Sequence, residues 1–375
     1  MPAPSTTESG GNEGPVTHRI PHSRPALGAL ELENLREVIS SGEIAQGPRV
    51  EQLEGAVASH LRPEAPGTAA GVAVSSGTAA LYVSLRALGI GAGDEVLVPA
   101  FVCASVLQAV HTAGATPRFV DCDPATFNID PADARRKVGG STRAIIVAHL
   151  FGLPADLDPL LELGPPVIED CAQTLGASYK GRPVGAFGKI STCSFYATKL
   201  LAAGEGGMVL SSSAEVLEHV RRLRNCDDPA SGEWAFNFKM SDLHAAVGLA
   251  QLEQLPESLA RRKTIAHHYR AALEKLPVRL PASLDDREHQ YFRFVVALKD
   301  GTLEPLLERC EELGLACRRP VGYLPGPVRD EMENLPGCRQ AWQTACSVPL
   351  YPALADDEVA LVVSRFEAAL GAVND

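Results

Sequence analysis

Short, nearly continuous apolar runs recur along the first two thirds of the chain, and segments with helical spacing separate them. Runs of this kind, bounded by turn residues, predict buried strands, whereas apolar positions three or four residues apart predict one face of a helix. Leu81, Leu85 and Leu88 show the helical spacing. Strands are predicted at 71–76, 95–100, 116–123, 143–152, 165–173, 190–197 and 206–212.

Helices are predicted before and between these strands. One helical region covers residues 30–61 and is interrupted by a turn at 41–48, and further helices cover 77–90 and 103–113. Strands that alternate with helices and are apolar throughout favour a mostly parallel sheet covered by helices on both faces. The fold class is therefore α/β.

The pattern changes near residue 256. A long charged helix over 256–276 leads to the apolar run FRFVVAL at 292–298, and a helix, a strand and a closing helix at 356–370 follow. This order predicts a smaller C-terminal α+β domain. The expected division is a leader at 1–20, a large domain at 21–255 and a small domain at 256–375.

Composition excludes several classes of protein. The net charge is −12 and no run of lysines or arginines occurs, so neither nucleic acid nor an anionic membrane is an expected partner. No run of 18 apolar residues occurs that would predict a membrane span. The leader is rich in Pro, Ser, Thr and Gly and lacks the apolar core of a signal peptide, so we expect disorder there and a cytoplasmic protein.

Nine cysteines are scattered along the 375 residues without a CxxC pair. This spacing argues against a disulfide framework and against a metal site built on cysteine. We expect mostly buried free thiols in a reducing compartment, and no metal.

The first candidate for chemistry is SSGTAAL at 75–81, where a strand ends and a helix begins. Backbone N–H groups and the helix dipole converge on such a turn, which makes it suitable for a phosphate. The alternative is an ordinary helix cap, with Ser76 or Thr78 as the capping residue. This motif by itself favours the cap.

A second candidate is VIEDCAQTLGA at 167–177, in which Glu169 and Asp170 end an apolar strand. Ligands of open α/β sheets bind beyond the carboxyl ends of the strands, so one of these acids is expected to face a site. Because side chains alternate along a strand, the other acid points away. A surface acid beside a capping acid explains the pair equally well.

The third candidate is Lys199, which lies among small and apolar residues in CSFYATKLLAAGEGGMV. Apolar surroundings disfavour the ammonium form and make the amine nucleophilic, although most lysines reach water instead. Ser194 nearby offers a hydroxyl to a phosphate. A phosphate turn, a strand-end carboxylate and an apolar lysine together supply what pyridoxal phosphate (PLP) requires, and this combination outweighs the separate alternatives.

Several longer motifs then identify a family. The chain resembles the DegT/DnrJ/EryC1/StrS family of PLP-dependent sugar aminotransferases, which have the type I aminotransferase fold, over nearly its whole length after the leader. The most specific similarity lies at 167–177 and 194–208. The motifs are GDEVLVPAFV, AGATPRFVDCDPATFNID, AHLFGLPADLDPL, IEDCAQTLGASYKGRPVGAFG, SFYATKLLAAGEGGMV and FNFKMSDLHAAVGLAQL.

The resemblance implies a role for each residue of the PLP site. Lys199 would form the internal aldimine and later move a proton between the substrate carbon and the cofactor. Asp170 would pair with the ring nitrogen and keep it charged, and Gln173 would hydrogen-bond the phenolic oxygen of the ring. The phosphate would be held by Gly77, Thr78 and Ser194.

The resemblance also implies a partner and a reaction. Asn237 matches a family residue that reaches the phosphate in the neighbouring subunit, so the functional unit would be a homodimer. Glutamate, or less often glutamine, would supply the amine. The acceptor would be a keto sugar, such as a nucleotide-linked 3- or 4-keto-deoxyhexose, and the product an amino sugar for a secondary metabolite or a glycan.

The chain departs from the family at two places. Cys103 stands where the family usually has an aromatic residue that stacks on the cofactor ring, so a thiol would pack there. In ACRRPVGYLPGP, Arg318 keeps the family's arginine but the residues after it differ. Three residues are weaker candidates for substrate contact: Tyr196, His149, which could instead bond a loop carbonyl, and Arg318.

Two other functions stay open at this stage. The acceptor could be a non-nucleotide ketone such as an inosose, which would place the enzyme in aminocyclitol synthesis. Cys103 and the altered segment after Arg318 could also indicate a catalytically weak partner or regulatory homologue.

Overall fold

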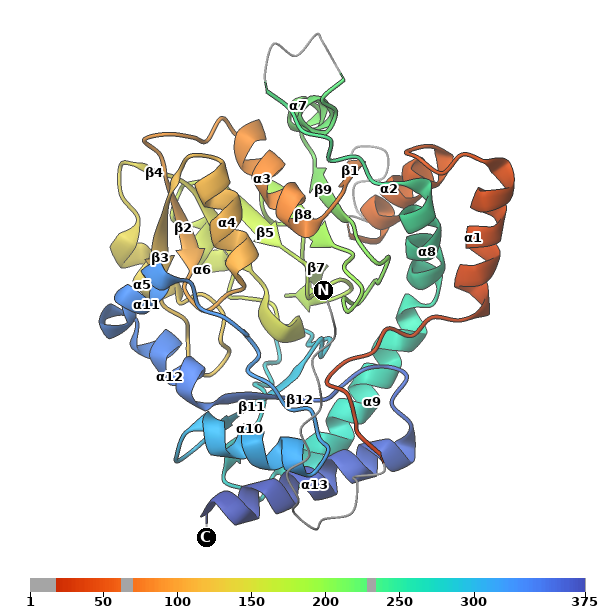
Figure 1. Cartoon of the computed structure of the whole chain (residues 1–375). Helices are drawn as coiled ribbons and strands as arrows, with labels where there is room; N and C mark the ends of the chain where they lie inside the picture. The colour runs from red at the N-terminus through yellow and green to blue at the C-terminus, as the bar shows by residue number, and fades with distance from the viewer. Residues whose placement is uncertain (1–17, 62–69, 228–233, 375) are drawn as a thin grey trace, which may run out of the picture.

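The centre of the computed structural model, which describes residues 18–61, 70–227 and 234–374, is a seven-stranded sheet (Figure 1). The strand order is β1-β9-β8-β5-β4-β2-β3. Within this sheet β9 runs antiparallel to both neighbours, so the other six strands share one direction, as predicted. The strands are β1 (Ala70–Val74), β2 (Glu95–Pro99), β3 (Thr116–Val120), β4 (Thr142–Ala148), β5 (Val167–Asp170), β8 (Ile190–Ser194) and β9 (Gly207–Ser211).

Helices cover both faces of this sheet, which confirms the α/β class. One face packs against α3 (Gly77–Ala87), α4 (Ala104–Thr112) and α7 (Ala214–Arg224). The other face packs against α2 (Pro48–Leu61), α5 (Pro131–Lys137), α6 (Asp158–Leu161) and α8 (Asp242–Glu253). Helix α1 (Ala29–Ser41) lies against α8 on the outside (Figure 1).

Most of these strands are largely apolar because both of their faces are buried, and the edge strand β3 is the exception, since Thr116 and Arg118 are exposed. In β2, Val96 and Val98 belong to the core on the α3 side, and Leu97 belongs to the core on the α2 side. All three side chains are fully buried. This alternation decides which side chains at the strand ends can share a site.

A second, smaller body follows at the C-terminal end of the chain. Its sheet has the order β10-β11-β12 and is antiparallel, and its helices enclose a separate apolar core. Helix α9 begins near residue 256, where the sequence predicted the boundary between the two domains. The division into these domains stays a prediction. The elements are α9 (Leu255–Leu273), β10 (Val278–Arg279), β11 (Phe294–Leu298), α10 (Leu303–Glu312), α11 (Gly326–Asp330), α12 (Pro336–Thr344), β12 (Ala345–Val348) and α13 (Asp356–Asn374).

The leader expected at 1–20 extends too far, because its last residue, Ile20, is part of the folded structure. Ile20 is fully buried in the C-terminal core, where its N–H donates to Gly314 O at 2.9 Å and its carbonyl accepts from Ala316 N–H at 3.1 Å. Residues 1–17, the rest of that expected leader, lie outside the described residues. The described chain therefore begins against the C-terminal body, because the apolar residues that bury Ile20 belong to that body.

Two further observations complete the fold. The strand β5 is followed by a small hairpin of β6 (Ser178–Tyr179) and β7 (Arg182–Pro183). Among the helices that the structure describes, none has the length and apolar character of a membrane span.

Candidate active site

A cavity lies at the end of the central sheet where β1, β5 and β8 finish. Its wall brings together residues that are far apart in the sequence but were all predicted to form one site. Glu205, Leu81 and Ser105 also line it. The predicted residues in the wall are Gly77, Thr78, Cys103, His149, Asp170, Gln173, Ser194, Tyr196 and Lys199.

The start of α3 forms one end of this cavity. Ser76 caps the helix, because its Oγ accepts from the Ala79 N–H at 3.1 Å. The next residue, Gly77, lies so close to β8 that an added Cβ would be 2.7 Å from the Ser194 Cβ. The cap and the phosphate turn are thus compatible: the helix N-terminus and the Ser194 hydroxyl face the same space, as an anion site requires.

The two adjacent carboxylates at the end of β5 point in opposite directions. Asp170 shares the α3 side of the sheet with Ile168 and lines the cavity. Its Oδ1 accepts from the Ala172 N–H at 3.0 Å. Burial raises the pKa of Asp170, and that N–H together with the charge of Lys199 opposes the rise. A cation placed against Asp170 would stabilise its ionised form.

Glu169 is fully buried on the other side of the sheet and is not the surface acid that the alternative required. It accepts from the N–H groups of Gly185 and Phe187, both at 2.8 Å, and from Gly188 at 2.5 Å. Although burial raises its pKa, the hydrogen bonds from His149 and from these amides hold that pKa below its ordinary value. Glu169 therefore fastens the loop after the β6–β7 hairpin onto β5.

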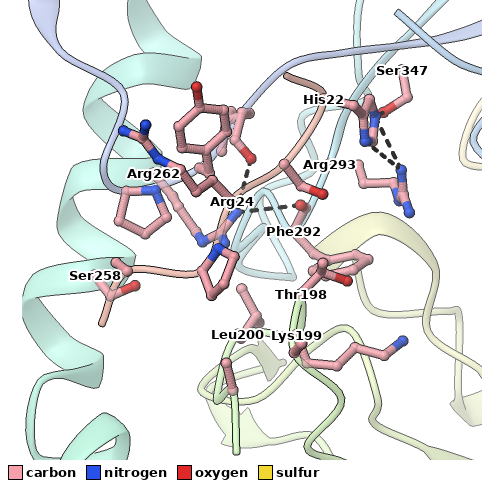
Figure 2. Close-up of a pocket in the computed structure, with 18 of the residues that line it drawn as sticks. His22, Arg24, Thr198, Lys199, Leu200, Ser258, Arg262, Phe292, Arg293 and Ser347 are labelled. Atoms are coloured by element: carbon pink, nitrogen blue, oxygen red, sulfur yellow. Dashed lines mark hydrogen bonds between the residues drawn. The ribbon is translucent and has the colours of Figure 1, made fainter. Parts of the chain in front are cut away.

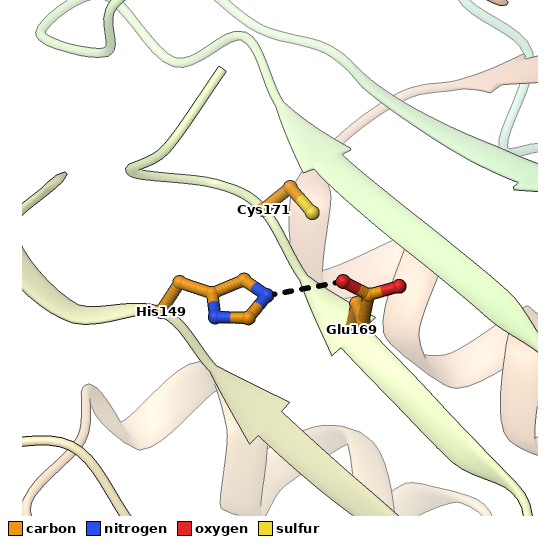
Figure 3. A group of neighbouring side chains, drawn as sticks. All are labelled: His149, Glu169 and Cys171. Carbon is orange, nitrogen blue, oxygen red and sulfur yellow. Dashed lines mark hydrogen bonds and ion pairs between the residues drawn. The ribbon is translucent and has the colours of Figure 1, made fainter. Parts of the chain in front are cut away.

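His149 points toward Glu169 (Figure 3). Its Nδ1 accepts from the Ala155 N–H at 3.0 Å, so the neutral ring carries its proton on Nε2, which lies 3.3 Å from Glu169 Oε2. His149 therefore bonds a loop N–H and Glu169 in place of the expected loop carbonyl, which was wrong, whereas its contact with substrate stays a prediction because His149 also lines the cavity. His149, Glu169 and Cys171 lie close enough together to hold a metal ion. Both Glu169 oxygens, however, already accept hydrogen bonds from backbone amides.

Lys199 lies in a tight loop after β8. Its N–H donates to Tyr196 O at 2.8 Å, and the Ala197 N–H donates to Gly204 O at 3.0 Å. The Nζ lies 5.2 Å from the centre of the Phe292 ring. Burial lowers the pKa of Lys199, in the direction that the sequence predicted, and the charge of Arg293 lowers it further while Cys103 and Asp170 act in the opposite direction.

The glycines after Lys199 are explained by the backbone conformation and tight packing of the loop. Gly204 and Gly206 have φ values of +85° and +144°, which favour glycine. At Gly206 an added Cβ would lie 2.9 Å from Met240 Cε, so the loop packs tightly against the start of α8. The GEGG sequence therefore shapes the turn that returns the chain from Lys199 into β9.

Gln173 has one fixed end and one end available to a ligand. Its side-chain oxygen accepts from the Phe151 N–H at 2.7 Å. Its NH₂ group donates no hydrogen bond to any residue that the structure describes, and the side chain lines the cavity. The predicted donation to a phenolic oxygen is therefore geometrically possible.

The remaining predicted residues lie at the edge of the site or outside it. Cys103 is exposed at the start of α4, with its Sγ 2.6 Å from Ser105 Oγ, and Tyr196 is 48% exposed on the rim. Asn237 is exposed and does not line the cavity of its own chain. Arg318 is exposed and pairs through its backbone with Ser347 of β12, outside the cavity wall.

Residues 25–367 match the DegT/DnrJ/EryC1/StrS aminotransferase family. The chain belongs to this family. It is 32% identical over 375 residues, 91% of this chain and 95% of the relative, to the spore coat polysaccharide biosynthesis protein SpsC of Bacillus subtilis (strain 168). The family and its solved structures make the chain a PLP-dependent transaminase.

Solved structures agree with the fold of this aminotransferase. The aminotransferase TlmJ from Streptoalloteichus hindustanus superposes with a TM-score of 0.87 at 31% identity, over 95% of this chain and all of that one. The PLP form of the putative sugar aminotransferase Spr1654 from Streptococcus pneumoniae gives 0.88 at 26% identity, over 95% and 100%. The type I aminotransferase fold and sugar amination as the class of reaction are thereby confirmed.

The structure also places Phe292 and His22, which the sequence did not single out, near Lys199 together with Arg293. A second cavity shares Lys199 with the first and is lined by the segment at 22–26, by α9 and by the residues before β11 (Figure 2). Phe292, Arg293 and His22 belong to it. No local pattern marks these three residues, since they meet only when the N-terminal segment crosses the C-terminal body.

Proposed function

We propose that this aminotransferase moves an amino group from glutamate, or from glutamine, to a nucleotide-linked 3- or 4-keto-deoxyhexose. The amino sugar would serve a secondary metabolite or a surface glycan. The family and the similarity to SpsC, a spore coat polysaccharide biosynthesis protein, support this assignment. The observation that carries it is the single cavity that contains Lys199, Asp170, Gln173 and the N-terminus of α3.

The residues of this cavity fit PLP. When bound, the cofactor supplies an electron sink for the carbon that exchanges its amine. The space between Gly77 and Ser194 would hold the phosphate against the start of α3, with Thr78 beside it. The Gln173 NH₂ group would hydrogen-bond the phenolic oxygen.

Lys199 and Asp170 would perform the proton and charge chemistry. The lowered pKa of Lys199 increases the neutral fraction of its amine, which is the form that can bond a carbonyl or accept a proton. Asp170 in its ionised form would hold a proton on the ring nitrogen. Cys103, with its small exposed thiol, would contact the ring with less area than an aromatic side chain.

A homodimer with shared sites is part of this proposal. Asn237 is exposed between Phe236 and Phe238, whose rings stack at 5.2 Å and both pack edge-on against Tyr82 of α3. Trp234 is 94% exposed in the same segment. Exposed aromatic side chains are typical of interfaces, and a partner would bring Asn237 to the neighbouring phosphate.

A cytoplasmic enzyme is the expected setting, because all nine cysteines are free thiols and seven of them are buried. Substrate contacts at Tyr196 and Arg318 stay proposals. Both residues are exposed, but only Tyr196 lines the cavity.

The first experiment tests the lysine. Purified enzyme mixed with PLP should show the visible absorption band of a lysine-bound cofactor, and Lys199→Ala should lose that band after dialysis. Lys189→Ala, which removes an exposed lysine before β8, is the matched control. A band that survives dialysis in Lys199→Ala would exclude Lys199 as the bonding residue.

A second experiment tests the acceptor. The pyridoxamine-phosphate form of the enzyme should transfer its amine to nucleotide-linked keto sugars and not to scyllo-inosose. Preference for the inosose would replace the sugar assignment with aminocyclitol synthesis. Failure of glutamate and glutamine alike to convert the PLP form would indicate a catalytically weak homologue.

A further inference from the structure

The hydrogen-bond acceptors of Arg293 differ from those of the other interior arginines that the structure describes. Arg224 donates to Glu54 and to a backbone carbonyl, Arg262 donates to three backbone carbonyls, and Arg287 donates to Asp286. Among the described residues, the Arg293 guanidinium has hydrogen-bond contacts only with the His22 ring, whose nitrogens lie 3.1 and 3.3 Å from its Nη1, and it lies over the Phe292 ring. Among the described residues Arg293 thus has no oxygen acceptor.

No carboxylate that the structure describes forms an ion pair with this guanidinium. Burial, with the charges of Arg293 and Arg318, lowers the pKa of His22 to about 3, so the imidazole is neutral. Burial also lowers the pKa of Arg293 to about 10, which still leaves it charged at neutral pH. Arg318 forms no ion pair with any acid that the structure describes. Two cations therefore face this region without a carboxylate, an arrangement that stabilises a bound anion.

The second cavity puts Arg293 beside the reactive lysine. Figure 2 shows Arg293 and His22 on the same side of the Lys199 loop as the end of the lysine side chain. Lys199, Phe292 and Arg293 line the cavity together, and no Asp or Glu is among its lining residues. The effect of Arg293 on Lys199 also indicates that the two cations are within electrostatic range.

We infer that Arg293 is the receptor for the α-carboxylate of the amino donor, held in place by His22. This inference rests on the proposed transaminase reaction with an amino acid. In an amino acid the carboxylate is attached to the same carbon as the reacting amine, so it must bind next to Lys199. The diphosphate of a nucleotide sugar is several bonds from the reacting carbon and fits this position less well.

Binding of a carboxylate at Arg293 has a chemical consequence for Lys199. The anion cancels the positive charge that makes the Lys199 amine less basic. The amine then accepts a proton more readily when a donor is present. Charge recognition and proton transfer would therefore be coupled through Arg293.

The test compares two donors that differ only in the α-carboxylate. L-Glutamate and 4-aminobutyrate are each mixed with the PLP form of the enzyme, and the loss of the visible band gives kcat/KM for this half-reaction. Wild-type enzyme should prefer glutamate. Arg293→Gln should lower the value for glutamate by about 100-fold and leave that for 4-aminobutyrate within about threefold, because a charge-assisted pair is lost. Arg339→Gln, at an exposed site on α12, should match wild type for both.

Binding is measured separately, in case Arg293→Gln is too slow to follow. Spectral titration with 2-methylglutamate, which has no α-hydrogen and stops after binding, should show the same loss of affinity in Arg293→Gln. An unchanged affinity, or a variant that loses both donors equally while it keeps the cofactor band, overturns the inference. A defect confined to the keto-sugar half-reaction also overturns it and assigns Arg293 to the acceptor. If wild-type enzyme reacts with no amino acid, the proposed function itself fails.

Discussion

The contact between Gly77 and Ser194 can be tested with a single added methyl group. In Gly77→Ala the new Cβ would lie 2.7 Å from the Ser194 Cβ and 3.1 Å from its Oγ. An ordinary contact begins near 3.4 Å, so the start of α3 must move away from β8 by about 0.7 Å. Hydrogen bonds from N–H to oxygen span only about 2.7–3.2 Å, so a shift of this size breaks at least one bond to a phosphate held there.

Two measurements follow from this displacement. Overpacking costs about 1–3 kcal/mol, partly offset by about 0.5–1 kcal/mol from alanine in place of glycine, so urea unfolding of the apoenzyme should show a net loss of about 1–2 kcal/mol. One charge-assisted hydrogen bond is worth about 1.5–3 kcal/mol, so the dissociation constant of PLP, titrated by its visible band, should rise about 10- to 100-fold.

The matched control is Gly55→Ala in the middle of α2, where an added Cβ meets nothing within 4 Å. This variant should be slightly more stable than wild type and should bind PLP normally. Gly77→Ala with wild-type affinity and wild-type stability would show that α3 does not approach β8 this closely and would remove the argument for a phosphate site here.

Three further predictions concern charge. Asp170→Ala should keep the cofactor band but lower the transamination rate about 100- to 1000-fold in stopped-flow assays, and a rate within tenfold of wild type would dissociate Asp170 from the chemistry. Asp242 is 1% exposed and accepts from the N–H groups of Gly47, Arg49 and Val50, so Asp242→Ala should lose about 3 kcal/mol in urea unfolding, whereas the exposed Asp300→Ala should lose nothing measurable. The folded-state pKa of His22 is about 3 against 6.5 unfolded, so the unfolded chain gains this proton first and stability falls as pH drops below 6.5. Between pH 7 and pH 5 wild type should therefore lose about 2 kcal/mol more than His22→Gln, and equal losses would contradict a buried neutral imidazole.

The central sheet and its site could be predicted because their signals are local. Most strands of this sheet are short, largely apolar runs, since helices bury both faces, and most site residues stand at the end of such a run or within a few residues of it. Helix α8 gave no comparable signal. It lies between α1 and α2, so most of its sides are apolar and no helical stripe appears.

The two carboxylates of β5 show what alternation along a strand can and cannot decide. The sequence predicted that only one of them faces the site. It did not show that Glu169 is buried, because the amides of Gly185, Phe187 and Gly188 and the His149 ring come from other segments. The same pairing gives His149 a carboxylate partner in place of the loop carbonyl expected of it.

The sequence by itself determined the α/β architecture and the order of the PLP-site residues along the chain, because apolar periodicity and strand-end motifs depend on near neighbours. The tertiary structure alone decided which residues join that site from a distance. Ile20 lies against Leu315, and His22 lies against Arg293, because burial of the N-terminal segment on the C-terminal core joins parts of the chain nearly 300 residues apart. An arginine without an oxygen acceptor is recognisable only once all of its neighbours are in place.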